Sequence, residues 1–107
     1  MNLYSVTVPD STEDSEFLVV APDALAAATL YVEGVTGDQL AVDTEEMADA
    51  GELDVHLIGD QPGEARVLQW GSDERVTRSL GPIETTEVKL DGIEAWTRYA
   101  ASEGLAP

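Results

Sequence analysis

Two apolar segments joined by a short polar stretch place the strongest constraint on how this chain folds. Residues 3–8 alternate between apolar and polar side chains, and residues 16–21 are nearly all apolar. Both patterns are typical of β-strands. Because Pro9 ends the first segment and residues 10–15 are polar, we expect the two strands to form a β-hairpin with a longish loop.

A helix is predicted directly after this hairpin. Asp23 follows Pro22 and is suited to cap a helix N-terminus, where its carboxylate meets the positive end of the helix dipole. Gly34 is expected to end the helix. The predicted packing face consists of Ala24, Ala27, Ala28 and Tyr31, with Leu25 and Val32 beside it.

A short acidic helix is predicted over residues 43–50, after a short strand over residues 39–42. Asp43 and Glu46 have the spacing of a capping box, and Gly51 follows as a stop signal. A helix of about two turns is not stable alone in water, so this one depends on packing against the rest of the domain.

Asp49 is the least expected residue in that helix. It repeats the charge of Glu45 one turn away and lies near the helix C-terminus, where the dipole disfavours an anion. A sequence selected only for helix stability would have Lys at this position. We interpret Asp49 as mild support for a role of negative charge at this surface.

The second half of the chain predicts further strands and a last helix. Residues 52–58 alternate, with Leu53, Val55 and Leu57 inward and Asp54 and His56 outward, and the turn 59–64 leads to a returning strand over 65–70. Further strands are expected over residues 75–80 and 85–90.

The last helix is expected to open with a second capping box, Asp91 and Glu94, and to run to about Ala101. Ile93, Trp96 and Ala100 should face inward, with Tyr99 beside them, and residues 102–107 should fray. These elements predict a single α+β domain over residues 1–107. It should contain a mainly antiparallel sheet of about four to five strands, two main helices and one short acidic helix.

The charge of the chain is strongly one-sided. It carries 22 acidic and 5 basic residues for a net charge of −17, and all basic residues follow Glu64. Such a charge argues against direct binding to nucleic acid or to anionic membranes, and it favours a basic partner. Without cysteine there is no disulfide or zinc-thiolate site. We find no signal peptide or transmembrane segment and expect a cytoplasmic protein.

Catalytic and metal-binding functions have little support in the sequence. His56 is the sole histidine and has no cysteine or adjacent nucleophile, so we interpret it as a surface or packing residue. The spacing of a calcium loop and the glycine motifs of phosphate sites are both missing. A paired-carboxylate site would need an apolar cleft, for which a domain of this size has little room. We therefore expect a non-enzymatic protein without a cofactor.

Aromatic residues are expected mainly in the core, although Trp70 at a strand end is an alternative anchor for a partner. The candidate partner-binding surface is instead acidic. Its residues lie between positions 38 and 64 and are Asp38, Asp43, Glu45, Glu46, Asp49, Glu52, Asp54, Asp60 and Glu64.

The opening layout, YSVTVPD…EFLVVAPDALAAATLYVEG, resembles small phage and mobile-element proteins in which a hairpin leads to an alanine-rich helix. Together with the lysine-free acidic segment 38–64, it is similar to the acidic anti-CRISPR proteins. The resemblance implies an inhibitor whose carboxylates occupy the DNA-phosphate-binding site of a nucleic-acid-binding protein or ribonucleoprotein complex. If the chain is phage-encoded, it would act in the host cytoplasm.

Two alternative functions remain open at this level, an acidic surface that serves solubility and an ion-dependent module in which Asp43, Glu45, Glu46 and Asp49 chelate calcium weakly. The acidic surface would serve solubility in a structural or accessory protein of a phage or of a halophile, whose proteins are rich in acid and poor in lysine. The chain would also be compatible with a homodimer.

Overall fold

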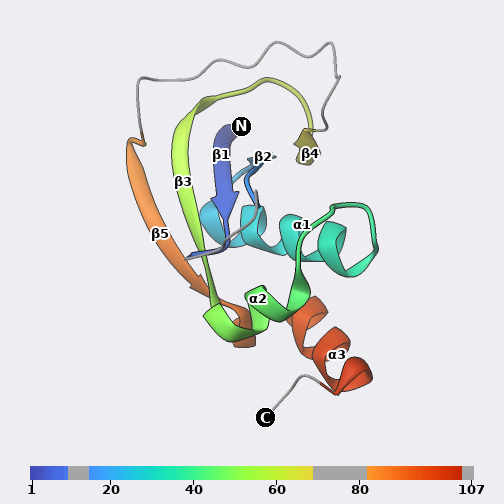
Figure 1. Ribbon diagram of the computed structural model, residues 1–107. Helices are drawn as coiled ribbons and strands as arrows, with labels where there is room; N and C mark the ends of the chain where they lie inside the picture. Colours follow the sequence, from blue (N-terminus) through green and yellow to red (C-terminus); the bar gives the residue numbers. More distant parts are fainter. Residues whose placement is uncertain (10–14, 69–81, 105–107) are drawn as a thin grey trace.

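The computed structural model describes residues 1–9, 15–68 and 82–104, and in this part of the chain an antiparallel sheet is covered on one face by helices (Figure 1). This architecture confirms the predicted α+β class. The strands are β1 (Asn2–Thr7), β2 (Phe17–Ala21), β3 (Glu52–Asp60), β4 (Arg66–Leu68) and β5 (Glu84–Lys89). The helices are α1 (Ala24–Thr36), α2 (Thr44–Ala50), α3 (Glu94–Glu103) and the short 3₁₀ turn η1 (Leu90–Gly92).

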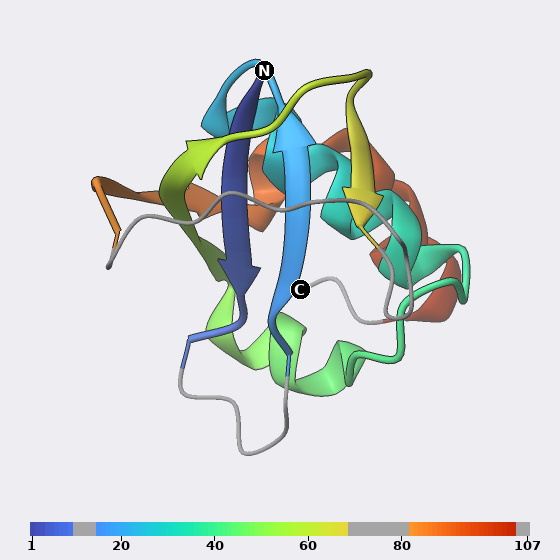
Figure 2. The ribbon, with the colours of Figure 1, turned by 90° about the horizontal axis from the view of Figure 1, so that it is seen from above.

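The strands follow the order β4-β2-β1-β3-β5, so β1 occupies the centre of the sheet (Figure 2). β1 and β2 form the predicted hairpin, with Val6 opposite Phe17 and Asn2 opposite Ala21. β5 lies at one edge beside β3 and confirms the strand predicted over residues 85–90.

The predicted hairpin between residues 52–58 and 65–70 is wrong. β3 pairs with β1 and β5, whereas β4 pairs with β2, placing Val67 opposite Val19 at the other edge of the sheet. Residues 61–65 carry the chain from one side to the other, as Figure 1 shows. The turn residues are compatible with a tight hairpin, but both sides of β3 are occupied by other strands.

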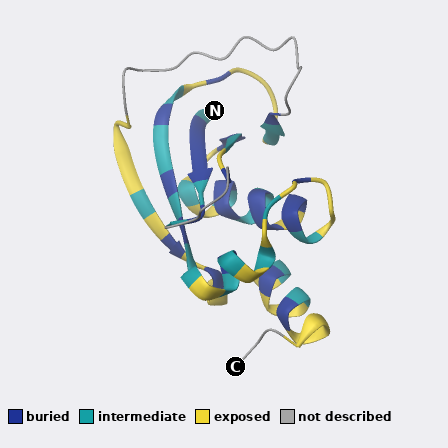
Figure 3. Ribbon diagram, viewed as in Figure 1, coloured by how far each residue is buried: buried dark blue, intermediate teal, exposed yellow. Residues whose placement is uncertain are grey.

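The main core lies between the sheet and the helices (Figure 3). The side chains of Tyr4, Val6, Val19, Leu53 and Val55 enter it from the sheet and are at least 95% buried. A second, smaller cluster lies on the opposite face of the sheet and consists of Leu3, Val20, Ile58 and Leu68. The sheet is therefore apolar on both sides near β1 and β2.

α1 confirms most of its predicted packing face and corrects its end. Asp23 accepts a hydrogen bond from the Ala26 N–H at 2.8 Å, as expected of an N-cap. The helix continues past Gly34 to Thr36, because Gly34 provides space for Leu40 rather than a helix stop. Leu25 is exposed rather than packed.

The loop after α1 also differs from the prediction. Residues 39–42 form no strand, and the Gln39 and Leu40 N–H groups instead donate to the Gly34 carbonyl at 2.8 and 3.1 Å. These bonds fold the loop back over the end of α1. Local apolar character at residues 39–42 was insufficient to form a strand, since the chain already turns at this point.

α3 shows the predicted inward face, with Ile93, Trp96 and Ala100 buried. Its predicted capping box is wrong, because Asp91 lies within η1 and the helix begins after Ile93 without a side-chain cap. The helix reaches Glu103, so residues 102 and 103 are helical rather than frayed. The predicted strand 75–80 and Trp70 lie outside the described residues.

Within the described ranges, no helix has both the length and the apolar character needed to cross a membrane.

Candidate acidic interaction surface

α2 is a short helix with a well-defined position. Met47 is fully buried in the core beneath it. Asp43 caps the helix as predicted, because its carboxylate accepts from the Glu45 N–H at 2.9 Å and the Glu46 N–H at 3.4 Å. Gly51 ends the helix in the left-handed conformation, with φ of 70°, which glycine adopts without steric cost.

Two further contacts hold α2 to neighbouring elements. The Gly51 carbonyl accepts from the Leu90 N–H at 3.0 Å, and the Tyr99 hydroxyl of α3 lies 3.4 Å from Thr44 Oγ1. The helix is too short to be stable alone, so this packing and capping account for its formation. Its side chains are consequently presented from a fixed backbone.

The outer side of α2 is acidic. Asp43, Glu45 and Asp49 are exposed and Glu46 is half-buried. In the part of the chain that the structure describes, Glu45 and Asp49 form no ion pair. The like-charge pair predicted from their spacing is therefore present at the surface, with no compensating base among the residues that the structure describes.

Asp38 and Glu52 flank this helix in the sequence but differ in their surroundings. Asp38 is exposed in the loop after α1 and adopts a positive φ of 59°, with its N–H donating to the Val35 carbonyl at 3.2 Å. Glu52 lies 3.1 Å from Lys89 Nζ across the β3–β5 pair. The pKa of Lys89 is raised, mainly because Lys89 donates a hydrogen bond to Glu52 and secondly because the negative charge of Glu52 favours the protonated amine. Glu52 is thus partly neutralised.

Asp54 lies on a different surface, the sheet face opposite the helices. It is half-buried between Thr7 on β1 and Glu87 on β5. Sequence reasoning missed Glu87 as its neighbour. The alternation of residues 84–89 would place Glu87 on one face of a strand, but which strand it joins depends on the sheet order.

His56 shares this face with Asp54, as the strand alternation predicted. Its Nδ1 lies 2.8 Å from Thr85 Oγ1 on β5. Its cross-strand partner on β1 is Ser5, whose hydroxyl donates to Glu16 Oε2 at 2.6 Å. These contacts make a polar row across the sheet. No group of three or more His, Asp or Glu side chains among the described residues is placed to hold a metal ion.

Asp60 and Glu64 lie at the far end of β3 and in the following turn, and both are exposed. At about 3.3 Å per residue, the eight steps from Glu52 to Asp60 extend up to about 26 Å. The nine predicted residues therefore do not form one contiguous row. The structure brings together Asp43, Glu45, Glu46 and Asp49, which we call the α2 acidic surface.

Comparison of the chain with protein-family models, with curated proteins and with solved structures found no match.

Proposed function

We propose that the protein is a non-enzymatic inhibitor that binds a basic, nucleic-acid-binding protein or ribonucleoprotein complex through the α2 acidic surface. Binding there would exclude nucleic acid from the partner, in the manner of an acidic anti-CRISPR protein. The observation that supports the proposal best is the exposed pair Glu45 and Asp49, one turn apart on a helix of fixed position and without a described ion-pair partner.

The charge spacing of this surface is close to that of a nucleic-acid strand. Residues 43–49 span about 9 Å of helix axis at 1.5 Å per residue and carry four carboxylates. The axial spacing is thus about 3 Å per charge, compared with about 3.4 Å per phosphate along one DNA strand. A groove of Lys and Arg built for phosphates would meet negative charges at a similar interval.

Rigidity and net charge support the same function. Carboxylates on a fixed backbone lose less conformational entropy on binding than those on a flexible tail. The net charge of −17 would attract a basic partner over a long range and raise the association rate at low salt. Bidentate pairs between Arg and carboxylate become strong where the interface excludes water.

The test is competition with labelled duplex DNA on purified basic complexes, with CRISPR effector ribonucleoproteins as the first panel. The variant Glu45→Gln, Glu46→Gln, Asp49→Asn removes three charges from α2 and keeps the Asp43 cap. The matched control removes three exposed charges elsewhere, through Asp60→Asn, Glu64→Gln and Glu87→Gln.

We expect the wild-type protein and the control to displace DNA, and the α2 variant to lose at least tenfold in apparent affinity. Equal competition by both variants would show that α2 is not the contact. Binding that leaves DNA uptake by the complex unchanged would refute the inhibitory role.

A second candidate function, solvation of a phage or halophile structural protein, is favoured by a different observation. Exposed acids also occur on elements other than α2, including Asp23 before α1, Glu84 and Glu87 on β5 and Glu103 on α3. If acidity serves solvation at high salt, the melting temperature should keep rising up to molar KCl, beyond the range in which charge screening is complete. A melting temperature that levels off below about 0.5 M would exclude this function.

A further inference from the structure

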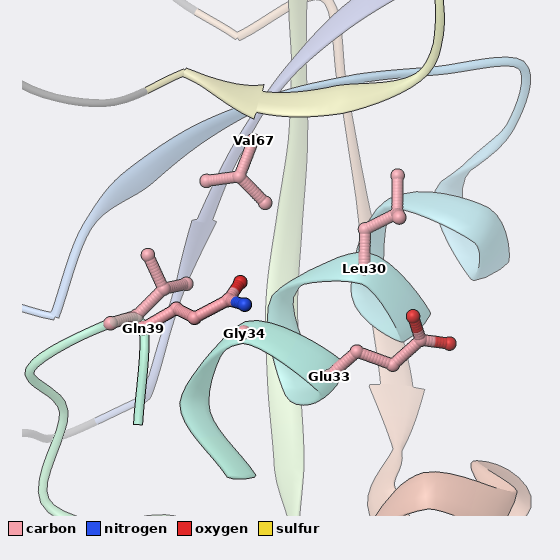
Figure 4. A pocket seen from close by; sticks show the side chains of 6 residues that line it. Leu30, Glu33, Gly34, Gln39 and Val67 are labelled. Carbon is pink, nitrogen blue, oxygen red and sulfur yellow. The ribbon is translucent and has the colours of Figure 1, made fainter. Parts of the chain in front are cut away.

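A groove runs between α1, the loop that follows it and the edge strand β4. Its deeper part is a cavity of about 380 Å³ lined by Leu30, Glu33, Gly34, Gln39, Leu40 and Val67. Figure 4 shows Val67 of β4 pointing into this cavity across from Leu30 and Gln39. The size falls within the range of ligand-binding pockets.

A second, more open hollow of about 520 Å³ continues the groove toward the start of α1. It shares Leu30 with the first and is also lined by Leu25, Ala26 and Ala65. Leu25 is 56% exposed and gives this hollow an apolar wall that is open to solvent. The two hollows together follow α1 from Asp23 to Glu33, which is ten residue steps and about 15 Å along the helix axis.

One wall of the groove is an edge strand. β4 pairs with β2 on one side, and no described strand pairs with its other side. An edge strand presents backbone N–H and carbonyl groups that can pair with an added strand. A groove between such an edge and a helix is a known geometry for binding an extended peptide, in which the backbone provides affinity and the side-chain pockets provide specificity.

The charges at the groove are negative. Glu33 lines the deeper cavity and is exposed, and Asp23 lines the other hollow. The basic residue of β4, Arg66, belongs to the opposite face of the sheet from Val67, and its Nη1 donates to the Glu64 and Pro62 carbonyls at 2.7 and 3.3 Å. Its guanidinium is thus turned toward its own turn and does not offset Glu33.

We infer that this groove binds an extended peptide segment of a partner protein that carries an apolar side chain for the Leu30–Val67 cavity and a Lys or Arg for Glu33. The segment would add a strand beside β4. This surface is separate from the α2 acidic surface, and the inference does not depend on the proposed function.

A second copy of the chain fits the groove poorly. A second copy could offer either described edge strand, β4 or β5. β5 carries the exposed Glu84 and Glu87, and β4 lies beside Glu33 of its own copy. Those carboxylates would approach Glu33 and be repelled. Charge complementarity therefore selects a basic peptide over self-association.

The test uses fluorescein-labelled nonapeptides in which Val, Ile or Leu alternates with Lys, Arg or Thr. A matched set has Glu or Asp in place of Lys or Arg. Binding to the full chain is followed by fluorescence anisotropy, and the site is located by amide chemical shifts and hydrogen exchange. We expect the basic set to bind, with shifts at Leu30 and Val67 and slowed exchange at the amides of β4.

The decisive comparison is Glu33→Lys against Glu103→Lys. Both change the net charge equally at exposed helix positions, so both should fold, but only the first lies in the groove, and neither belongs to the α2 acidic surface. We expect Glu33→Lys to weaken peptide binding at least tenfold and Glu103→Lys to weaken it less than threefold.

Four results would overturn the inference. The first three are equal weakening by the two variants, equal binding of the acidic peptides, and shifts that map away from α1 and β4. Dimerisation of the chain at micromolar concentration, with the same amides protected, would assign the groove to a second copy and would also overturn it. If the α2 variant Glu45→Gln, Glu46→Gln, Asp49→Asn loses DNA competition but keeps peptide binding, the groove and the α2 acidic surface are separate binding sites, as inferred.

Discussion

Replacing Asp49 by Lys should stabilise the protein. The change removes the repulsion with Glu45 one turn away and creates an attractive pair at the same spacing, each worth about 0.2–0.5 kcal/mol. It also places a cation instead of an anion near the C-terminus of α2, which adds about 0.3–1 kcal/mol. Because both side chains are exposed, no desolvation cost opposes these gains. We expect the free energy of unfolding to rise by about 0.7–2 kcal/mol, or roughly 3–8 °C in melting temperature.

Urea denaturation at low ionic strength measures this gain. Asp60→Lys is the control, because it changes the net charge equally at an exposed position outside any helix and should alter stability by no more than about 0.5 kcal/mol. In 1 M KCl, where the screening length is about 3 Å, the difference between the two variants should fall by more than half. A variant Asp49→Lys that is no more stable than Asp60→Lys would refute the reasoning from helix electrostatics.

Three other substitutions test the packing of the helices, all by urea denaturation. Met47→Ala should lower the free energy of unfolding by about 2–5 kcal/mol, because Met47 is fully buried. Gly34→Ala should lower it by about 1 kcal/mol, since its Cβ would lie 2.8 Å from Leu40 Cδ1 and this overpacking exceeds the gain in helix propensity. Asp43→Ala should lower it by about 1 kcal/mol, because the cap of α2 is lost. An unchanged midpoint in any of these variants would contradict the packing or capping contact from which its effect is predicted.

Short-range features of the fold could be predicted from the sequence. The α2 helix forms where Asp43 and Gly51 indicated, because a cap and a left-handed C-terminal glycine act within a few residues. Asp23 caps α1 for the same reason. The alternation in residues 3–8 and 52–58 identified strands, because successive side chains of any strand point to opposite faces whatever its partner. Burial of β1 on both faces was not predicted in this way.

Features that depend on distant residues could not be predicted in this way. Gly34 was predicted to end α1, because glycine commonly ends helices. The structure gives another reason for a glycine here: Leu40 packs where the Cβ of a larger residue would lie. The turn 59–64 fits a hairpin equally well, and the choice of β2 as the partner of β4 depends on the whole sheet. The groove beside β4 was missed for this reason, because Leu30 and Val67 are neighbours only in that strand order.

Strand order also determines how many acidic surfaces the protein has. With β3 between β1 and β5, Asp54 lies on the sheet face away from the helices, and Asp60 lies up to about 26 Å from Glu52. Even half of this upper limit, about 13 Å, exceeds both the screening length of about 8 Å at physiological salt and the range of about 7–10 Å within which substitutions usually interact. Charge removal at Asp60 and at Asp49 should therefore have additive effects on the binding of any one partner. Coupling above about 0.5 kcal/mol in a double-mutant cycle would show that a single partner surface engages both ends of β3 cooperatively.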